Sequence, residues 1–194
     1  MLSKSDLINI NKALEILGKS GVVAVPTDTV YGLVADYEDL QAIDKISKIK
    51  GRAENKQYVL QIAYFHQLEM LTATISKETE LIIRRYWPGQ VTFIFNINPL
   101  LKLNYLQETI AVRMPSHELM LKLLQLYNRP LVVTSFNKAG EEPVCNAQDI
   151  SEDLRGKLDY LLESTAQSSK VASTIVDLTK TVPQVIRQGI IIFE

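Results

Sequence analysis

The sequence predicts a single α/β domain with a mixed β-sheet flanked by helices. Apolar runs typical of strands alternate along the chain with segments of helical periodicity, which is the pattern of α/β proteins. The connections between them are too uneven for a simple parallel repeat, which favours a mixed sheet. At 194 residues, with 46% hydrophobic and 22% charged residues, the chain has the size and composition of one soluble globular domain. We therefore expect residues 1–194 to form one domain.

The elements of the first half are predicted in chain order. Apolar residues at helical spacing and a serine cap predict a helix over 5–17, which Gly18 and Gly21 end. The apolar run 22–25 predicts a buried strand, which stops at Pro26 because proline cannot donate a ladder hydrogen bond. Apolar residues that recur every three positions predict a helix over 40–49, which Gly51 ends. A strand is expected over 58–63. A further helix is expected over 77–86.

The second half continues the alternation after the breaking sequence Trp87-Pro88-Gly89. Strands are expected over 91–95 and 109–114, followed by a helix over 117–127 and a buried strand over 131–134. Residues 137–146 read as a polar loop, and 149–154 as a short helix. Two late strands are expected over 173–178 and 183–187.

Residues 26–33, Pro-Thr-Asp-Thr-Val-Tyr-Gly-Leu, are the most informative segment. A turn that only reversed the chain would need glycine or asparagine rather than four hydrogen-bonding side chains. The alternative is a plain structural loop. The composition favours a binding loop at the end of the first strand.

Two basic residues, Lys50 and Arg52, flank the glycine at the end of the second predicted helix. Basic residues there also offset the helix dipole, which is the structural alternative. The functional interpretation is an anion clamp, since a lysine point charge and a planar arginine fork both suit phosphate oxygens.

Three later segments carry polar groups out of apolar runs. The strand 131–134 opens into Thr134, Ser135 and Asn137, which either bind an anion at a strand end or form a local turn. Arg113 lies inside an apolar strand, where a charged group either faces solvent or is buried with a partner. The last of these segments is 172–177, which is followed by Arg187 and Gly189.

Several functional classes lack support in the sequence. Twenty-one basic and 22 acidic residues give a net charge of −1, which does not indicate a dedicated nucleic-acid binder. The two histidines lack metal-ligand spacing, so we expect no metal site built by the protein. No glycine-rich phosphate loop, GxGxxG or GxSxG occurs. One cysteine, no signal-peptide pattern and no long apolar run predict a reducing, cytoplasmic setting and no membrane association.

Taken in order, the motifs resemble those of the YrdC/TsaC family, the threonylcarbamoyl-AMP synthases, over about residues 8–190. The family pattern Pro-Thr-[Asp/Glu]-Thr-Val-Tyr-Gly-Leu matches 26–33. The remaining family motifs match Lys50 and Arg52, Trp87 to Thr92, Val112 to Pro115, Ser135 and Asn137, Ser173 to Asp177, and Arg187 with Gly189. The resemblance implies a YrdC-like fold, a twisted mixed sheet with helices around a concave, positively lined cavity, in the short single-domain form.

The chain departs from the family pattern at a few positions. Phe136 stands where alanine is usual, which we expect to add bulk beside the phosphate contacts. Ala53, Gln57-Tyr58 and Gln61 also differ, the last from a histidine in some relatives, and Glu141-Glu142 adds negative charge nearby. These changes leave the main cationic groups in place.

The resemblance implies the first step of tRNA t6A37 modification. L-threonine, bicarbonate and ATP, with Mg²⁺ held by phosphates and water, would give threonylcarbamoyl-AMP and pyrophosphate. A downstream transferase complex of the TsaD type would then act on the tRNA, and binding of tRNA or double-stranded RNA is a further expectation. The reaction is a nucleotidyl transfer that alignment and charge neutralisation can serve.

The resemblance also implies roles for individual residues. Lys50 and Arg52 are expected to be catalytic and to hold the triphosphate. The other expected ATP or phosphate ligands are Arg113, Thr134, Ser135, Asn137 and Arg187, the two arginines being candidates for the amino-acid carboxylate as well. The expected threonine pocket consists of Thr29, Tyr31 and Ser173. Two alternatives stay open: a related carbamoyl-adenylate enzyme with another acyl donor, and a non-catalytic RNA-binding module.

Overall fold

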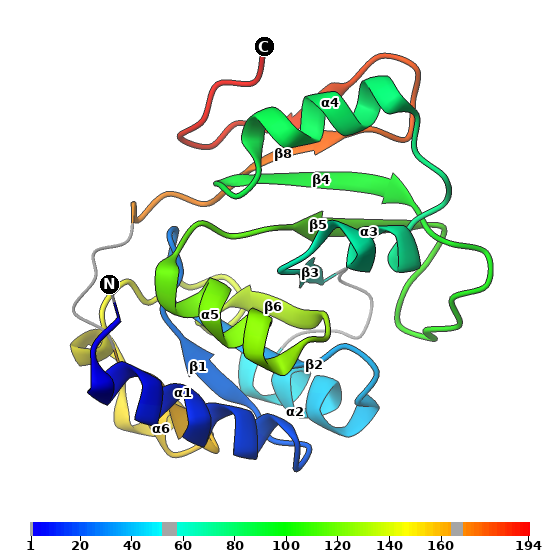
Figure 1. Cartoon of the computed structure of the whole chain (residues 1–194). Coiled ribbons are helices and arrows are strands. Elements are labelled where there is room, and N and C mark those ends of the chain that lie inside the picture. The colour runs from blue at the N-terminus through cyan, green and yellow to red at the C-terminus, as the bar shows by residue number, and fades with distance from the viewer. Residues whose placement is uncertain (1, 52–57, 164–168) are drawn as a thin grey trace.

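The structure is a computed structural model that describes residues 2–51, 58–163 and 169–194 (Figure 1). Its described strands form one nine-stranded sheet in the order β7-β1-β2-β6-β3-β5-β4-β8-β9. The strands are β1 (Val23–Val25), β2 (Gly32–Asp36), β3 (Val59–Gln61), β4 (Val91–Asn96), β5 (Thr109–Arg113), β6 (Leu131–Ser135), β7 (Tyr160–Leu161), β8 (Thr174–Asp177) and β9 (Gln184–Arg187). The helices are α1 (Lys4–Leu17), α2 (Leu40–Lys50), α3 (Phe65–Leu71), α4 (Lys77–Tyr86), α5 (Glu118–Tyr127), α6 (Glu152–Arg155) and the 3₁₀ turn η1 (Ala147–Asp149).

The sheet is mixed, as the uneven connections predicted. β1–β2, β2–β6, β3–β6, β4–β5 and β8–β9 are antiparallel pairs, whereas β1–β7, β3–β5 and β4–β8 are parallel. The predicted α/β class with a mixed sheet flanked by helices is therefore confirmed.

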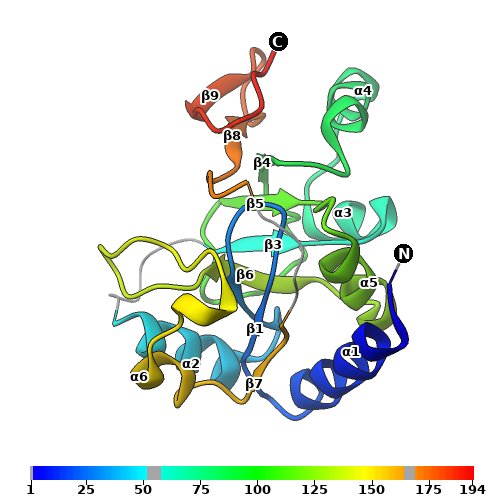
Figure 2. The ribbon, with the colours of Figure 1, turned by 90° about the vertical axis from the view of Figure 1, so that its left-hand side faces the viewer.

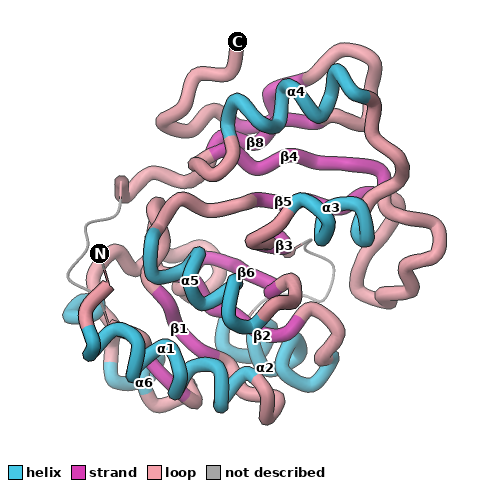
Figure 3. The backbone as a smooth tube through the Cα atoms, viewed as in Figure 1, coloured by secondary structure: helices cyan, strands magenta, loops and turns pink. Residues whose placement is uncertain are grey.

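Helices cover both faces of the part of the sheet that contains β1, β2 and β6. In Figure 2, α1 and α5 lie on one side of these strands and α2 and α6 on the other; in Figure 3, α1 and α5 lie in front of the strands. Alternation along the strands explains the two layers, since successive side chains point to opposite faces. Val23 and Val25 pack with α1 and α5, whereas Ala24 packs with α2.

The other part of the sheet, β3, β5, β4 and β8, has a helix layer on one face only. Leu60, Phe93 and Val112 are completely buried there, in the same core as residues of α3 and α4. Figure 2 shows α3 and α4 on one side of these strands and no helix on the other. The uncovered face is the one that carries polar side chains.

Four elements were not predicted from the sequence: β2, α3, η1 and β7. Each is short, and tertiary contacts define it. β7 has two residues paired with β1. The N-cap of α3 is Tyr64, whose side chain makes no capping bond; instead the Gln67 Oε1 accepts from the backbone amides of Ala63 and Tyr64. The short helix predicted over 149–154 is found slightly later, as α6. No described helix is both long and apolar enough to cross a bilayer.

Candidate functional site

A cavity of about 320 Å³ opens on the uncovered face of the sheet, a volume within the usual range for small-molecule sites. The loop between β1 and β2 forms one wall, and the rest comes from strands β2, β3, β4, β5, β6, β8 and β9 together with loop residues that follow β6 and precede β8. No acidic residue is among the described residues that line it. The lining residues are Thr27, Thr29, Val30, Tyr31, Gly32, Val59, Gln61, Thr92, Arg113, Val133, Thr134, Ser135, Pro143, Ala172, Ser173, Ile175 and Arg187.

Strand register explains why these side chains share one face. Residues directly opposite each other on neighbouring strands point to the same side of a sheet. Gln61 is opposite Arg113, and Ile175 is opposite both Thr92 and Arg187. The intervening residues, such as Val112, point to the helix-covered core. One face of these strands is therefore reserved for packing and the other for polar groups.

Lys50 is the last residue of α2 and is buried, with only 4% of its surface exposed. The helix ends there because Gly51 adopts the left-handed conformation, which favours glycine. The Lys50 Nζ donates to the Ser135 carbonyl, to the Asn137 carbonyl (3.0 Å) and to the Asn137 Oδ1 (2.8 Å). These hydrogen bonds fix the lysine against the end of β6. It lies at the edge of the cavity, because Ser135, which it contacts, lines the cavity.

Arg113, at the end of β5, is held on three sides. Its Nε donates to the Gly89 carbonyl (2.9 Å), its Nη2 to Asp28 Oδ1 (2.6 Å) and its Nη1 to Thr29 Oγ1 (3.4 Å). Burial lowers the pKa of Arg113 and Asp28 opposes that shift, and arginine stays charged in proteins. The arginine is therefore buried with a partner, one of the two outcomes left open by the sequence.

Arg187 lies on the edge strand β9 and reaches back over β8. Its Nε and Nη2 donate to the Ser173 carbonyl at 3.1 and 2.9 Å, and the Ser173 hydroxyl exchanges a hydrogen bond with Thr92 (2.8 Å). Partial burial lowers the pKa of Arg187. Within the described ranges no carboxylate pairs with this guanidinium, so its charge is available to an anion in the cavity.

The loop 26–31 presents Thr29 and Tyr31 to the same cavity. Thr27 holds the loop, because its Oγ1 donates to the Val30 carbonyl (2.6 Å) and accepts from the Thr29 and Val30 amides. The Tyr31 amide donates to Val144, and its carbonyl accepts from Phe136. Both threonines are buried, so this loop is a rigid wall of the cavity.

The structure brings most of the predicted site residues together. The cavity is lined by Thr29, Tyr31, Arg113, Thr134, Ser135, Ser173 and Arg187, and Lys50 and Asn137 contact Ser135 at its edge. Arg52 lies outside the described residues, as do Ala53 and Gln57. The Phe136 side chain is completely buried in the core and does not line the cavity, so the expected bulk beside the phosphate contacts is not found.

Four polar residues at the site were not assigned a role from the sequence: Thr27, Asp28, Gln61 and Thr92. Asp28 partners Arg113, and a buried arginine in an apolar strand could have prompted a search for such a carboxylate. Gln61 is buried in the cavity wall, and its Oε1 accepts no hydrogen bond from the described part of the protein. Only strand pairing reveals that it adjoins Arg113. No group of three or more histidine, cysteine or acidic side chains that could hold a metal occurs among the residues described.

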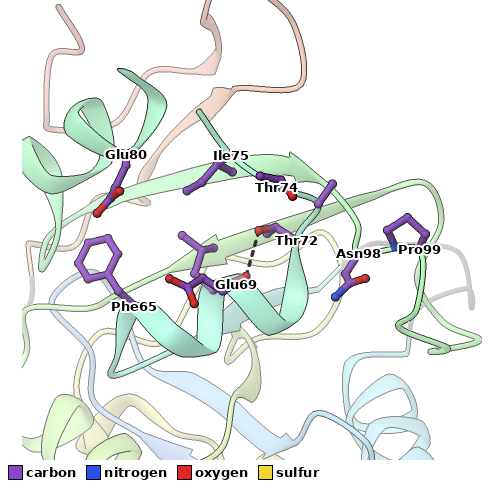
Figure 4. Close-up of a pocket in the computed structure, with 10 residues that line it drawn as sticks. Phe65, Glu69, Thr72, Thr74, Ile75, Glu80, Asn98 and Pro99 are labelled. Atoms are coloured by element: carbon purple, nitrogen blue, oxygen red, sulfur yellow. Dashed lines mark hydrogen bonds between the residues drawn. The ribbon is translucent and has the colours of Figure 1, made fainter. Parts of the chain in front are cut away.

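A larger hollow of about 520 Å³ lies elsewhere, beside α3 (Figure 4). Phe65, Ile75 and Pro99 contribute apolar surface, and its charged lining residues are Glu69 and Glu80. None of the predicted site residues lies there. Acidic side chains repel phosphates and carboxylates, so this hollow does not suit the anionic ligand that the sequence motifs indicate.

Gly189 holds β9 close to Ser173, and a side chain there is expected to disturb the site. A Cβ at this position would lie 2.4 Å from the Ala172 carbonyl oxygen and 2.5 Å from the Thr174 amide nitrogen. We expect Gly189→Ala to displace Arg187 and to lower stability by about 1–3 kcal/mol, as overpacking typically does. Thermal unfolding measures the effect. Gly18→Ala, whose Cβ meets no atom closer than 3.4 Å, is the matched control, and equal stability of the two variants would contradict the expectation.

Comparison with known proteins identifies the family. Residues 15–189 match the Sua5/YciO/YrdC family model, which is described as telomere recombination. The chain belongs to the Sua5/YciO/YrdC family. The family predicted from the motifs is thereby confirmed.

Members of the Sua5/YciO/YrdC family resemble the chain over most of its length. A curated threonylcarbamoyl-AMP synthase of Pyrococcus abyssi is 34% identical over 94% of this chain. The crystal structure of the P. abyssi Sua5 protein complexed with L-threonine matches 93% of the chain with a TM-score of 0.85 and 35% identity. Escherichia coli YciO matches 93% of this chain and 89% of its own, with a TM-score of 0.84 and 27% identity. The chain spans about half of the two P. abyssi proteins, 57% and 54% of their lengths.

Proposed function

We propose that this protein is an L-threonylcarbamoyladenylate synthase, which converts L-threonine, bicarbonate and ATP to threonylcarbamoyl-AMP and pyrophosphate. The observation that carries the proposal is the cavity itself. Arg113 and Arg187 line it, Lys50 lies at its edge, and no described lining residue is acidic. Such a site suits a ligand set with several negative charges, and the P. abyssi relatives are a threonylcarbamoyl-AMP synthase and a complex with L-threonine.

The chemistry needs alignment more than a protein nucleophile. The threonine amine and bicarbonate form N-carboxythreonine with loss of water. A carboxylate oxygen of this carbamate then attacks the α-phosphorus of ATP, and the bond from that phosphorus to the bridging oxygen of pyrophosphate breaks. Fixed cations offset the charge of the phosphates, and a rigid cavity keeps the reacting oxygen and phosphorus in contact distance. Mg²⁺ would enter with ATP, held by phosphates and water, because the lining offers hydroxyls rather than carboxylates.

The contacts suggest how the substrates divide the cavity. Lys50, Ser135 and Asn137 form one cluster, which we assign with Thr134, Arg187 and Arg52 to the triphosphate. Arg113 instead contacts Thr29, and we assign it with Tyr31 and Ser173 to L-threonine, the arginine facing the carboxylate. The vacant acceptor of Gln61 would take a hydrogen bond from the amine or hydroxyl of the bound amino acid.

The decisive experiment is pyrophosphate release from ATP by the purified full chain. Release should require L-threonine and bicarbonate together, with serine and glycine as poorer substrates, and mass spectrometry should detect threonylcarbamoyl-AMP. Release without threonine would indicate a carbamoyl-adenylate enzyme with another acyl donor. Absence of release together with salt-dependent RNA affinity would indicate a binding module.

Replacing Thr29 with valine tests the threonine side of the cavity. The hydroxyl lies 3.0 Å from Thr27 Oγ1 and 3.4 Å from Arg113 Nη1, so its loss removes a polar contact and loosens the arginine. We expect Thr29→Val to raise the KM for L-threonine by roughly 10-fold and the KM for ATP by less. Steady-state kinetics with each substrate varied gives both values. A larger effect on ATP would move Thr29 to the nucleotide side.

We also propose that the product feeds a TsaD-type transferase complex acting on tRNA in the cytoplasm. This follows from the proposed reaction, because threonylcarbamoyl-AMP is an activated carbamate whose use requires an acceptor. Four lysines, Lys45, Lys48, Lys138 and Lys157, each pair with an aspartate, which reduces what they would contribute to an RNA-binding surface.

A further inference from the structure

We propose that Asp28 is a positioning residue, which orients the Arg113 guanidinium so that its remaining N–H groups serve the amino-acid carboxylate. The inference rests on the proposed function for the identity of that ligand. What supports it is the set of contacts made by the Asp28 carboxylate. This residue is 8% exposed and contacts both Arg113, which lines the cavity, and Ser116, which precedes α5.

Both oxygens of the Asp28 carboxylate are occupied. Oδ1 accepts from Arg113 Nη2 at 2.6 Å, and Oδ2 accepts from the Ser116 hydroxyl at 2.7 Å and the Ser116 amide at 3.1 Å. Ser116 precedes α5, whose N-terminus favours a nearby negative charge. Asp28 is therefore anchored on the side away from Arg113, as a residue must be if it is to fix the orientation of another.

The Asp28 main chain is anchored as well. Its carbonyl accepts from Gln90 Nε2 (2.8 Å) and from the Ser169 amide (3.1 Å). Gln90 adjoins Gly89, whose carbonyl accepts from Arg113 Nε. The same short stretch of chain thus determines the position of two of the three groups that hold the guanidinium.

Arginine has five N–H donors, and the hydrogen bonds of Arg113 to Gly89, Asp28 and Thr29 use three of them. Because the fork is planar, fixing Nε at Gly89 and Nη2 at Asp28 determines where the other two N–H groups point. Arg113 lines the cavity, so these donors are the ones left for a ligand. Asp28 supplies an orientation that no apolar neighbour could impose.

His117 does not compete with Arg113 for the charge of Asp28. It caps α5, and its Nδ1 accepts from the Met120 amide. Burial lowers the pKa of His117, although Asp28 opposes the shift, so the imidazole is neutral near pH 7. The charged partner of Asp28 in the described protein is therefore Arg113.

A simple electrostatic role makes the opposite prediction from a positioning role. If Asp28 only offset positive charge, its removal would raise the positive potential of the cavity and tighten binding of a carboxylate. If Asp28 orients Arg113, its removal frees the guanidinium and weakens binding. The sign of the change separates the two roles.

The test measures binding of L-threonine and of ATP by calorimetry to the full chain carrying Asp28→Asn, Arg113→Ala or both changes. We expect Asp28→Asn to weaken L-threonine binding at least about 10-fold, to change ATP binding less than about threefold, and to add little to Arg113→Ala in the double variant, as for residues that act as a unit. Asp28→Glu, which keeps the carboxylate, should restore most of the affinity. Unchanged or tighter threonine binding, equal losses for both ligands, or additive effects would overturn the inference.

Two further measurements keep the result interpretable. If Asp28→Asn does not fold, as judged by circular dichroism, Ser116→Ala decides. It removes only the hydroxyl that anchors Asp28 and should weaken threonine binding by about two- to fivefold; unchanged affinity would overturn the inference. If the unaltered chain binds L-threonine but releases no pyrophosphate, the proposed reaction fails, whereas the positioning role is still decided by the binding data.

Discussion

An alanine in place of Lys50 is expected to lower threonine-dependent pyrophosphate release by roughly 100- to 1,000-fold, the usual cost of removing a fixed donor from a developing charge. The Lys50 ammonium is buried and held in place by oxygens of Ser135 and Asn137. These oxygens take the three N–H groups of the ammonium, so its positive charge is fixed at the edge of the cavity, where it offsets the charge of the phosphates. Kinetics at saturating L-threonine and bicarbonate measure the loss in kcat.

The same contacts link α2 to the end of β6, so the Lys50 variant needs a structural control. Lys50→Met keeps most of the aliphatic stem and removes the ammonium group with its three hydrogen bonds. We expect it to fold and to bind L-threonine with unchanged affinity but to be as inactive as the alanine variant. Lys48→Ala, on the exposed side of the same helix and paired with Asp44, should remain active. Near-normal turnover by Lys50→Met would refute the phosphate role.

Replacing Arg113 with alanine is expected to affect both threonine binding and stability strongly. The KM for L-threonine should rise by about 100-fold or more, because a buried charged hydrogen-bond donor is lost. The Asp28 carboxylate is left buried without its cation, and breaking a buried pair in this way typically costs about 3–5 kcal/mol. Urea unfolding and substrate kinetics measure the two effects separately.

A second change distinguishes the two consequences of losing Arg113. Asp28→Asn combined with Arg113→Gln removes both charges and keeps a polar side chain at each position, the asparagine having the shape of the aspartate it replaces. We expect the double variant to regain much of the stability and none of the threonine affinity. Arg85→Ala, an exposed position on α4, is the control for removing an arginine. Recovery of threonine binding in the double variant would show that Arg113 does not hold this substrate.

Much of the fold could be predicted because local patterns and the final packing agree. The run 22–25 became a completely buried strand, and the helix predicted over 77–86 has those bounds, with Ser76 as its cap. β2 was missed since only three apolar residues lie between Gly32 and Asp36, too few to establish a period. Its existence depends on pairing with β1 and β6, which the local sequence does not encode.

The site residues could be named from ordered motifs, but their partners could not. Arg113 was recognised as a charge in an apolar strand, whereas its carboxylate, Asp28, lies 85 residues away in sequence. Gln61 drew notice only as a departure from the family pattern. Its place beside Arg113 follows from the parallel pairing of β3 with β5, which arises from the fold as a whole.

The strand order also bears on how the protein emerges from the ribosome. β1 is synthesised long before its neighbour β7, and the Val22 amide donates to Asp159, 137 residues later. β4 likewise pairs with β8, which is synthesised much later. Closing such long loops before their contacts form slows folding, so a nascent chain lacking β7 and β8 has neither edge of its sheet complete. We infer that the cavity, which includes residues of β8 and β9, forms only after those strands have been synthesised.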